Sequence, residues 1–177
     1  MTVETLSRAY GRLLDVLAIL GAALWFAMMI VIVLDVFLRN SALVPGMRGV
    51  PGANELSESA LYLITMLTAP WLLRRGQHIR VDILLRVIPK RLAWYCEWAV
   101  DVIALVCSLV LLAYGWKATV ASINTGSMTI KSIAWPEWWL LAPLPLTFAL
   151  LSVEILFRMQ RLAIGPRAPR DDAVSSA

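Results

Sequence analysis

Six carboxylates lie within or beside long apolar stretches of this sequence, and such groups could carry protons or cations across a membrane. They are Asp15, Asp35, Glu58, Glu97, Asp101 and Glu154. An ionised side chain at the centre of a membrane span costs about 2.5–3.5 kcal/mol, so each is a hypothesis of function by default. Most lie within about two helical turns of an expected span end, where water and headgroups reach them. Their positions therefore favour boundary anchoring or a polar contact with another helix.

Three pairs of these charged residues are four positions apart and so share a helix face. In two of them an acid precedes an arginine, which predicts an ion pair with the arginine reaching outward. These are Asp35 with Arg39 and Glu154 with Arg158. The third pair, Glu97 and Asp101, lies in the first turns of an apolar segment, where a helix N-terminus favours negative charge. Asp101 is the deepest of the six and the least explained by its position.

Other kinds of reactive site are excluded by the residue types. His78 is the only histidine, so one chain can supply neither a bis-histidine haem site nor a three-histidine metal site. No Ser–His–Asp arrangement and no glycine-rich phosphate loop is present. Cys96 and Cys107 are separated by about 16 Å along a helix, so they cannot bond to each other within it. We therefore expect no enzyme activity, no metal and no cofactor.

The elements that must position these residues are predicted to be membrane spans. Of the 177 residues 60% are hydrophobic and 16% are charged, whereas soluble domains carry about a quarter charged residues. About 20 apolar residues cross the hydrocarbon, and four such segments occur, with Asn54 a plausible N-cap of the second. Pro143 and Pro145 predict a kink in the fourth, and no helix-breaking pair in another span mirrors them. The expected spans are 13–38, 55–73, 92–116 and 138–157.

The placement of Lys and Arg predicts the orientation of these spans. With four spans, the N-terminal tail, the second connection and the C-terminal tail share one side and hold twelve basic residues, against four on the other side. The positive-inside rule then places both termini in the cytoplasm. The fold class expected is all-α: a polytopic membrane protein in one domain, residues 1–162, followed by a disordered tail at 163–177.

The stretch 72–91, "LLRRGQHIRVDILLRVIPKR", holds six of the basic residues and the only histidine. Apolar residues recur at helical spacing between Gly76 and Pro89, and Asp82 and Arg86 are four positions apart. A segment of ten residues is too short to span a membrane. We therefore expect a short amphipathic helix at about 79–88 lying in the cytoplasmic interface, where it would hold the second and third spans at a fixed angle.

The order and spacing of several motifs resemble a known family. "GQHIRVD" at 76–82 is the most specific; an amphipathic stretch ending in "IPKR", the sequence "WPEWW" before the fourth span, and "PLPLTFALL" within it follow in order. The start of the second span, "NELSESALY", carries Glu55 and Glu58 at the acidic positions of that family. Over about residues 10–162 the chain resembles the small, DctQ-type membrane subunit of the tripartite ATP-independent periplasmic (TRAP) transporters.

This resemblance implies a non-catalytic subunit of the bacterial inner membrane that scaffolds and orients a large partner subunit. The large subunit would hold the sodium and substrate sites, and a periplasmic binding protein would deliver organic acids to it; phospholipids surround the chain and no nucleic acid is expected. The solute would be selected by those two components. Expected structural or partner contacts are Glu55, Glu58, His78, Arg80, Asp82, Asp101, Trp135 and Pro136. Possible contacts with the binding protein are Arg48, Lys131 and Glu137.

Two other functions remain open from the residues alone. One is a stand-alone, homo-oligomeric, proton-coupled exporter in which Asp101 or Glu97 exchanges the proton. Against it, such a transporter usually builds a midplane site from broken helices or repeated halves, and the sequence shows no internal repeat. The other is a membrane anchor for a redox enzyme, in which a partner chain would supply the missing haem ligands.

Overall fold

A computed structural model describes residues 3–40, 49–76, 89–129 and 134–164 of the chain. Four of its helices are long: α1 (Val3–Asn40), α2 (Ala53–Arg74), α4 (Lys90–Thr125) and α6 (Pro143–Ile164). A short helix, α5 (Trp138–Leu141), precedes α6. Apart from turns, the other regular feature in the described part is an isolated bridge between Met128 and Pro136. The all-α class expected from composition is confirmed.

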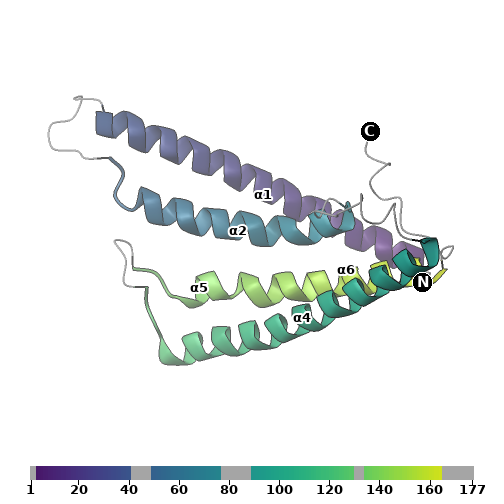
Figure 1. Ribbon diagram of the computed structural model, residues 1–177. Coiled ribbons are helices and arrows are strands. Elements are labelled where there is room, and N and C mark those ends of the chain that lie inside the picture. The colour runs from purple at the N-terminus through teal and green to yellow at the C-terminus, as the bar shows by residue number, and fades with distance from the viewer. Residues whose placement is uncertain (1–2, 41–48, 77–88, 130–133, 165–177) are drawn as a thin grey trace.

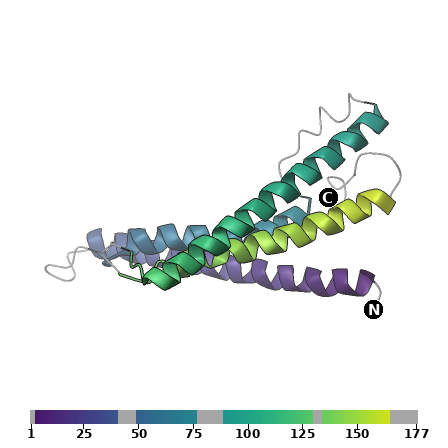
Figure 2. The same ribbon diagram turned by 90° about the horizontal axis from the view of Figure 1, so that it is seen from below.

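At the end where α1 stops and α2 begins, the long helices lie side by side in a layer, in the spatial order α1, α2, α6, α4 (Figure 1). Helix α1 packs on α2, α2 on α6, and α6 on α4, so α1 and α4 form the two edges of the layer there. Toward its N-terminus α1 crosses α2 and also contacts α6, where Tyr10 bonds to Leu150. Figure 2 shows the layer from another side, with α4 running obliquely and diverging from α1 toward the end that holds the N-terminus. We call this the N-terminal end (residues 7–15, 71–75, 97–101 and 154–161) and the opposite one the distal end (residues 35–40, 49–53, 122–129 and 134–139).

Four helical segments are long and apolar enough to cross a membrane: Ser7–Asn40, Ala53–Arg74, Leu92–Thr125 and Trp138–Ile164. The four predicted spans fall on these segments, but the helices continue further. With a rise of 1.5 Å per residue, the 38 residues of α1 measure about 57 Å, nearly twice the hydrocarbon thickness of about 30 Å. The polar ends of the long helices therefore extend beyond the hydrocarbon. For this reason span boundaries taken from the apolar stretches of the sequence lie inside the helix ends.

Two expected features of the helix termini can be compared with the structure. Asn54 is not the N-cap of α2: Gly52, with φ of 77°, holds that position and its carbonyl accepts the Leu56 N–H at 2.9 Å. The left-handed conformation of Gly52 starts the helix at Ala53, two residues earlier than expected, and glycine adopts it without strain. In the fourth span the helix breaks at Ala142, so Pro143 opens α6 and Pro145 lies in its first turn, where a missing N–H is tolerated.

The surface of the layer is apolar. Large apolar side chains are exposed along α1 and α4, including Trp25, Phe26, Ile103 and Trp116. The buried residues, by contrast, include many polar ones, among them Asp35, Glu97, Asp101, Thr147 and Glu154. A chain that turns its apolar residues outward and its charges inward is built for lipid or for a membrane-embedded partner.

Candidate functional site: the interhelical polar network

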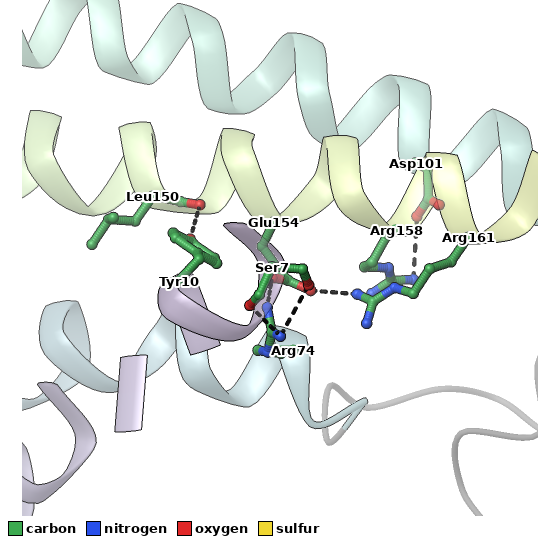
Figure 3. A network of polar contacts seen from close by, with 8 residues as sticks. All are labelled: Ser7, Tyr10, Arg74, Asp101, Leu150, Glu154, Arg158 and Arg161. Carbon is green, nitrogen blue, oxygen red and sulfur yellow. Dashed lines mark hydrogen bonds and ion pairs between the residues drawn. The ribbon is translucent and has the colours of Figure 1, made fainter. Parts of the chain in front are cut away.

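Glu154 is the centre of a polar network at the N-terminal end (Figure 3). Its side chain is fully buried in α6. One carboxylate oxygen lies 3.1 Å from the Arg74 guanidinium of α2, and the other accepts a hydrogen bond from Arg161, two turns further along α6. Arg74 also donates to the Ser7 carbonyl on α1, at 2.8 Å. A single, largely buried arginine thus joins α1, α2 and α6.

Tyr10 adds a second connection between α1 and α6 beside this network. Its hydroxyl donates to the Leu150 carbonyl at 2.7 Å, and its ring centroid lies 5.7 Å from that of Phe157. The Arg74 guanidinium carbon lies 5.8 Å from the centre of the Tyr10 ring, within cation–π range. Gly11 makes this approach possible, because a Cβ there would lie 2.9 Å from an Arg74 nitrogen.

Asp101 pairs with Arg158 across the α4–α6 contact, at 3.2 Å, and both side chains are largely buried (Figure 3). The expected pairing of Glu154 with Arg158 is therefore replaced: Arg158 faces Asp101 on the next helix, while Glu154 takes Arg74 and Arg161. The attraction between opposite charges is strongest in a low-dielectric interior, so a buried carboxylate is stabilised most by a cation in the same contact between two helices. Sequence spacing reveals only partners on the same helix.

Asp35 forms the predicted i,i+4 ion pair with Arg39, at 2.9 Å, and this expectation is confirmed. Its other oxygen accepts the Val50 backbone N–H at 2.7 Å, which ties the chain before α2 to the end of α1. Gly49 beside it has φ of 97°, and a Cβ there would lie 2.5 Å from that Asp35 oxygen. Glycine is required here by both backbone conformation and space.

Backbone pairing at the distal end fixes the positions of Trp135, Pro136 and Glu137. The Thr129 N–H donates to the Trp135 carbonyl at 3.0 Å, and the Glu137 N–H donates to the Ser127 carbonyl at 3.1 Å. Glu137 also precedes α5 and accepts the Leu140 N–H at 3.0 Å, while its side chain is exposed. These three residues thus lie in a segment before α5 that is paired by its backbone to residues 127–129 after α4.

A proline that sequence reasoning passed over shapes the middle of the layer. Pro70 lies inside α2, fully buried, and has no N–H for the carbonyl of Met66. The Thr147 hydroxyl of α6 donates to that carbonyl at 3.0 Å. A proline within a span predicts an unpaired carbonyl four residues earlier, which a threonine of another span can bind. The sequence does not show which threonine lies beside it.

The remaining predicted residues are dispersed. Glu55 lies half-buried in the first turn of α2 and Glu58 is exposed one turn later, at the distal end, far along α2 from Arg74. Glu97 is buried one turn before Asp101 on α4. His78, Arg80, Asp82, Arg48 and Lys131, like the helix expected at 79–88 and the tail at 163–177, lie outside the described residues.

The chemistry of the network is electrostatic fastening of helices. Within the described residues, no group of three or more His, Cys, Asp or Glu side chains is placed to hold a metal ion. Cys96 and Cys107 are both unbonded and exposed on α4. Glu154 and Asp101 are each paired with an arginine of another helix, whereas Asp35 pairs with Arg39 of its own helix and binds the Val50 N–H of the chain before α2.

Four apolar spans fastened by interhelical ion pairs define a multi-pass helical membrane protein. Comparison with known families matches residues 28–164 to the DctQ component of the tripartite ATP-independent periplasmic transporters, so the chain belongs to this family and is the small subunit of such a transporter. The first 27 residues, which include about the first two thirds of α1, lie outside the matched range. No curated protein matches the chain.

Proposed function

We propose that this chain is a non-catalytic scaffold subunit of a sodium-coupled secondary transporter that imports organic acids. The observation that carries the proposal is the way the buried charges are used. Arg74, Glu154, Asp101 and Arg158 connect α1, α2, α6 and α4 to one another at one end of the layer. Charges that are paired between helices support a scaffold role better than a role in a transport path. The family assignment supports a scaffold within a TRAP transporter.

The partner is a large membrane subunit that holds the sodium and substrate sites. Support for such a partner comes from the layered arrangement, which leaves α1 and α4 as edges with exposed apolar side chains. Helix contacts in a membrane depend on shape and on polar links rather than on hydrophobicity, so the exposed faces of these linked helices offer a packing surface. Substrate choice and ion coupling then belong to the partner.

Both termini lie in the cytoplasm of a bacterial inner-membrane protein, as the distribution of basic residues favours. The N-terminal end, with Arg74 and Arg75, then faces the cytoplasm and the distal end faces the periplasm. The binding protein meets the distal end, where Glu137 is exposed; Arg48 and Lys131 are its proposed companions. Glu55, Glu58, Trp135 and Pro136 are proposed to shape the same periplasmic end.

The stretch 76–89 braces the second and third spans on the cytoplasmic side. Support comes from its sequence, in which His78, Arg80 and Asp82 precede an apolar face at helical spacing. His78→Ala and Asp82→Ala should reduce co-purification with the large subunit, while Gln77→Ala should not. Unchanged co-purification and unchanged transport in both variants would leave this stretch with a topological role only.

Uptake by proteoliposomes tests the function directly. Vesicles would contain the chain alone, the large subunit alone, or both, each with the binding protein and an inward sodium gradient. Labelled organic acid should accumulate only where both membrane chains are present. Sodium-driven accumulation with this chain alone would show that it carries a transport site itself. An impermeant maleimide checks the orientation in a chain whose Cys96 and Cys107 are replaced by serine. Glu137→Cys should be labelled from outside the cell, and Ala177→Cys only after the membrane is opened.

A further inference from the structure

A groove opens between α1 and α2 at the edge of the layer and runs from the N-terminal end toward its middle. Its volume is about 550 Å³, within the range of about 300–1,000 Å³ of ligand sites in proteins. The walls are apolar: Ala18, Gly21 and Ala22 on α1 and Ile64 on α2 line it, with Trp25 at the inner end. Small side chains on α1 create the hollow, since larger ones would fill it.

The groove offers hydrocarbon rather than hydrogen bonds along its length. Thr68 lines it, but its hydroxyl donates to the Ile64 carbonyl of its own helix at 2.8 Å. Its methyl group meets α1 where a Cβ on Gly21 would lie 2.8 Å away, so the two helices touch here. The occupant of such a channel must be apolar over this length.

One end of the groove is polar. The Trp71 indole N–H donates to the Asp15 carboxylate at 2.9 Å, and the Arg75 guanidinium lies over the Trp71 ring, 4.9 Å from its centroid. Arg75 is 3.8 Å from Asp15, and its side chain is 58% exposed, so it can take a second anionic partner. Arg8 and Arg12 are exposed on α1. Arg12 comes four residues after Arg8 and three before Asp15, so the three side chains share one stripe of the helix. The mouth itself holds Arg75 and Asp15, and Arg12 and Arg8 add two cations about one and two turns further along α1.

The length of the groove fits an acyl chain. From Asp15 to Trp25 the groove follows ten residues of α1, about 15 Å, which is half the hydrocarbon thickness. One leaflet's depth, an apolar channel and a cationic mouth with an interfacial tryptophan together describe a phospholipid.

We propose that this groove is a binding site for one anionic glycerophospholipid of the leaflet at the N-terminal end. An acyl chain lies between Ala18, Ala22 and Ile64, and the phosphate pairs with Arg75, with Arg12 and Arg8 nearby on the same stripe. The site does not depend on the proposed transport role, and its α1 wall lies outside the family-matched residues 28–164. A lipid held there closes the gap beside the Gly21–Thr68 contact, where protein atoms alone leave the layer hollow.

Photo-crosslinking in vesicles tests the site with the full chain, alone and with its large partner. The probe is phosphatidylglycerol carrying a diazirine in the middle of one acyl chain. Crosslinks should concentrate in residues 15–25 and 64–75, and unlabelled phosphatidylglycerol should compete for them. Diacylglycerol, which has the same chains and no phosphate, should compete at least about fivefold less well, the factor that one cation at an anionic surface provides.

Two pairs of variants make the outcome decisive. Ala22→Trp fills the groove and should abolish the concentrated labelling, whereas Ala23→Trp, one position around the same exposed helix, should not. Arg75→Gln leaves the groove open and should weaken competition by phosphatidylglycerol about fivefold, whereas Arg39→Gln at the distal end should leave it unchanged. Even labelling along α1 and α4 that Ala22→Trp does not alter would overturn the proposal. So would loss of the labelling when the large subunit is added, because the partner would then be the occupant.

Discussion

The Thr147 hydroxyl on α6 donates a hydrogen bond to the Met66 carbonyl on α2, at 3.0 Å. That carbonyl lacks its usual partner within α2 because the residue four positions later is Pro70. In hydrocarbon an unpaired carbonyl costs several kcal/mol, so a side chain of a neighbouring helix replaces the missing donor. The carbonyl freed by Pro70 in α2 thereby forms a hydrogen-bonded contact with α6.

Thr147→Val should lower the free energy of unfolding by about 1 kcal/mol, the usual size of a hydrogen bond between membrane helices. The measurement is unfolding in mixed micelles by increasing SDS. Thr65→Val is the matched control, because the Thr65 hydroxyl donates to Leu61 of its own helix and the residue is exposed. Adding Pro70→Ala to Thr147→Val should recover part of the loss, since an alanine N–H can reach Met66. Equal effects of the two threonine variants would show that the Thr147 contact does not stabilise the layer.

Glu154→Gln should be among the most destabilising single changes. It removes the one carboxylate that Arg74 and Arg161 share and leaves Arg74 charged and largely buried. Breaking a buried pair in this way costs about 3–5 kcal/mol. Glu137→Gln, at an exposed position, should change the free energy of unfolding by no more than about 0.5 kcal/mol. The same SDS titration measures both, and a near-neutral Glu154→Gln would mean that the network does not hold α2 to α6.

The number of spans and the Asp35–Arg39 pair could be predicted from the sequence, because hydropathy and i,i+4 spacing are local properties. The pairs Arg74–Glu154 and Asp101–Arg158 could not: their members are separated by 80 and 57 positions, and the sequence shows only that each charge lies near a span end. The same limit led to the wrong partner for Arg158. Which helix lies beside which is decided by packing, through residues such as Gly11 and Gly115 that allow close approach.

Exchanging the charges of Asp101 and Arg158 separates a structural role from a transport role for Asp101. Asp101→Asn and Arg158→Gln should each destabilise the protein, because each removes the ion pair that links α4 to α6 at this position. The double variant Asp101→Arg with Arg158→Asp should recover much of that stability and retain co-purification with the large subunit. Proton-coupled efflux that is lost in the stable exchanged variant would instead favour the exporter hypothesis.

Gly115→Ala should raise the helix propensity of α4 but worsen its packing against α6, and we expect the packing effect to be the larger. Alanine favours a helix interior over glycine by about 1 kcal/mol. A Cβ on Gly115 of α4, however, would overlap the Leu144 side chain at the start of α6 and approach Pro145. Overpacking typically costs about 1–3 kcal/mol, so the variant should unfold more easily, and adding Leu144→Ala should reverse the loss. Ala118→Val, at an exposed position one turn along α4, is the control for added bulk alone and should be nearly neutral. If Gly115→Ala proved stabilising and Leu144→Ala gave no rescue, the close contact between α4 and α6 at this position would be disproved.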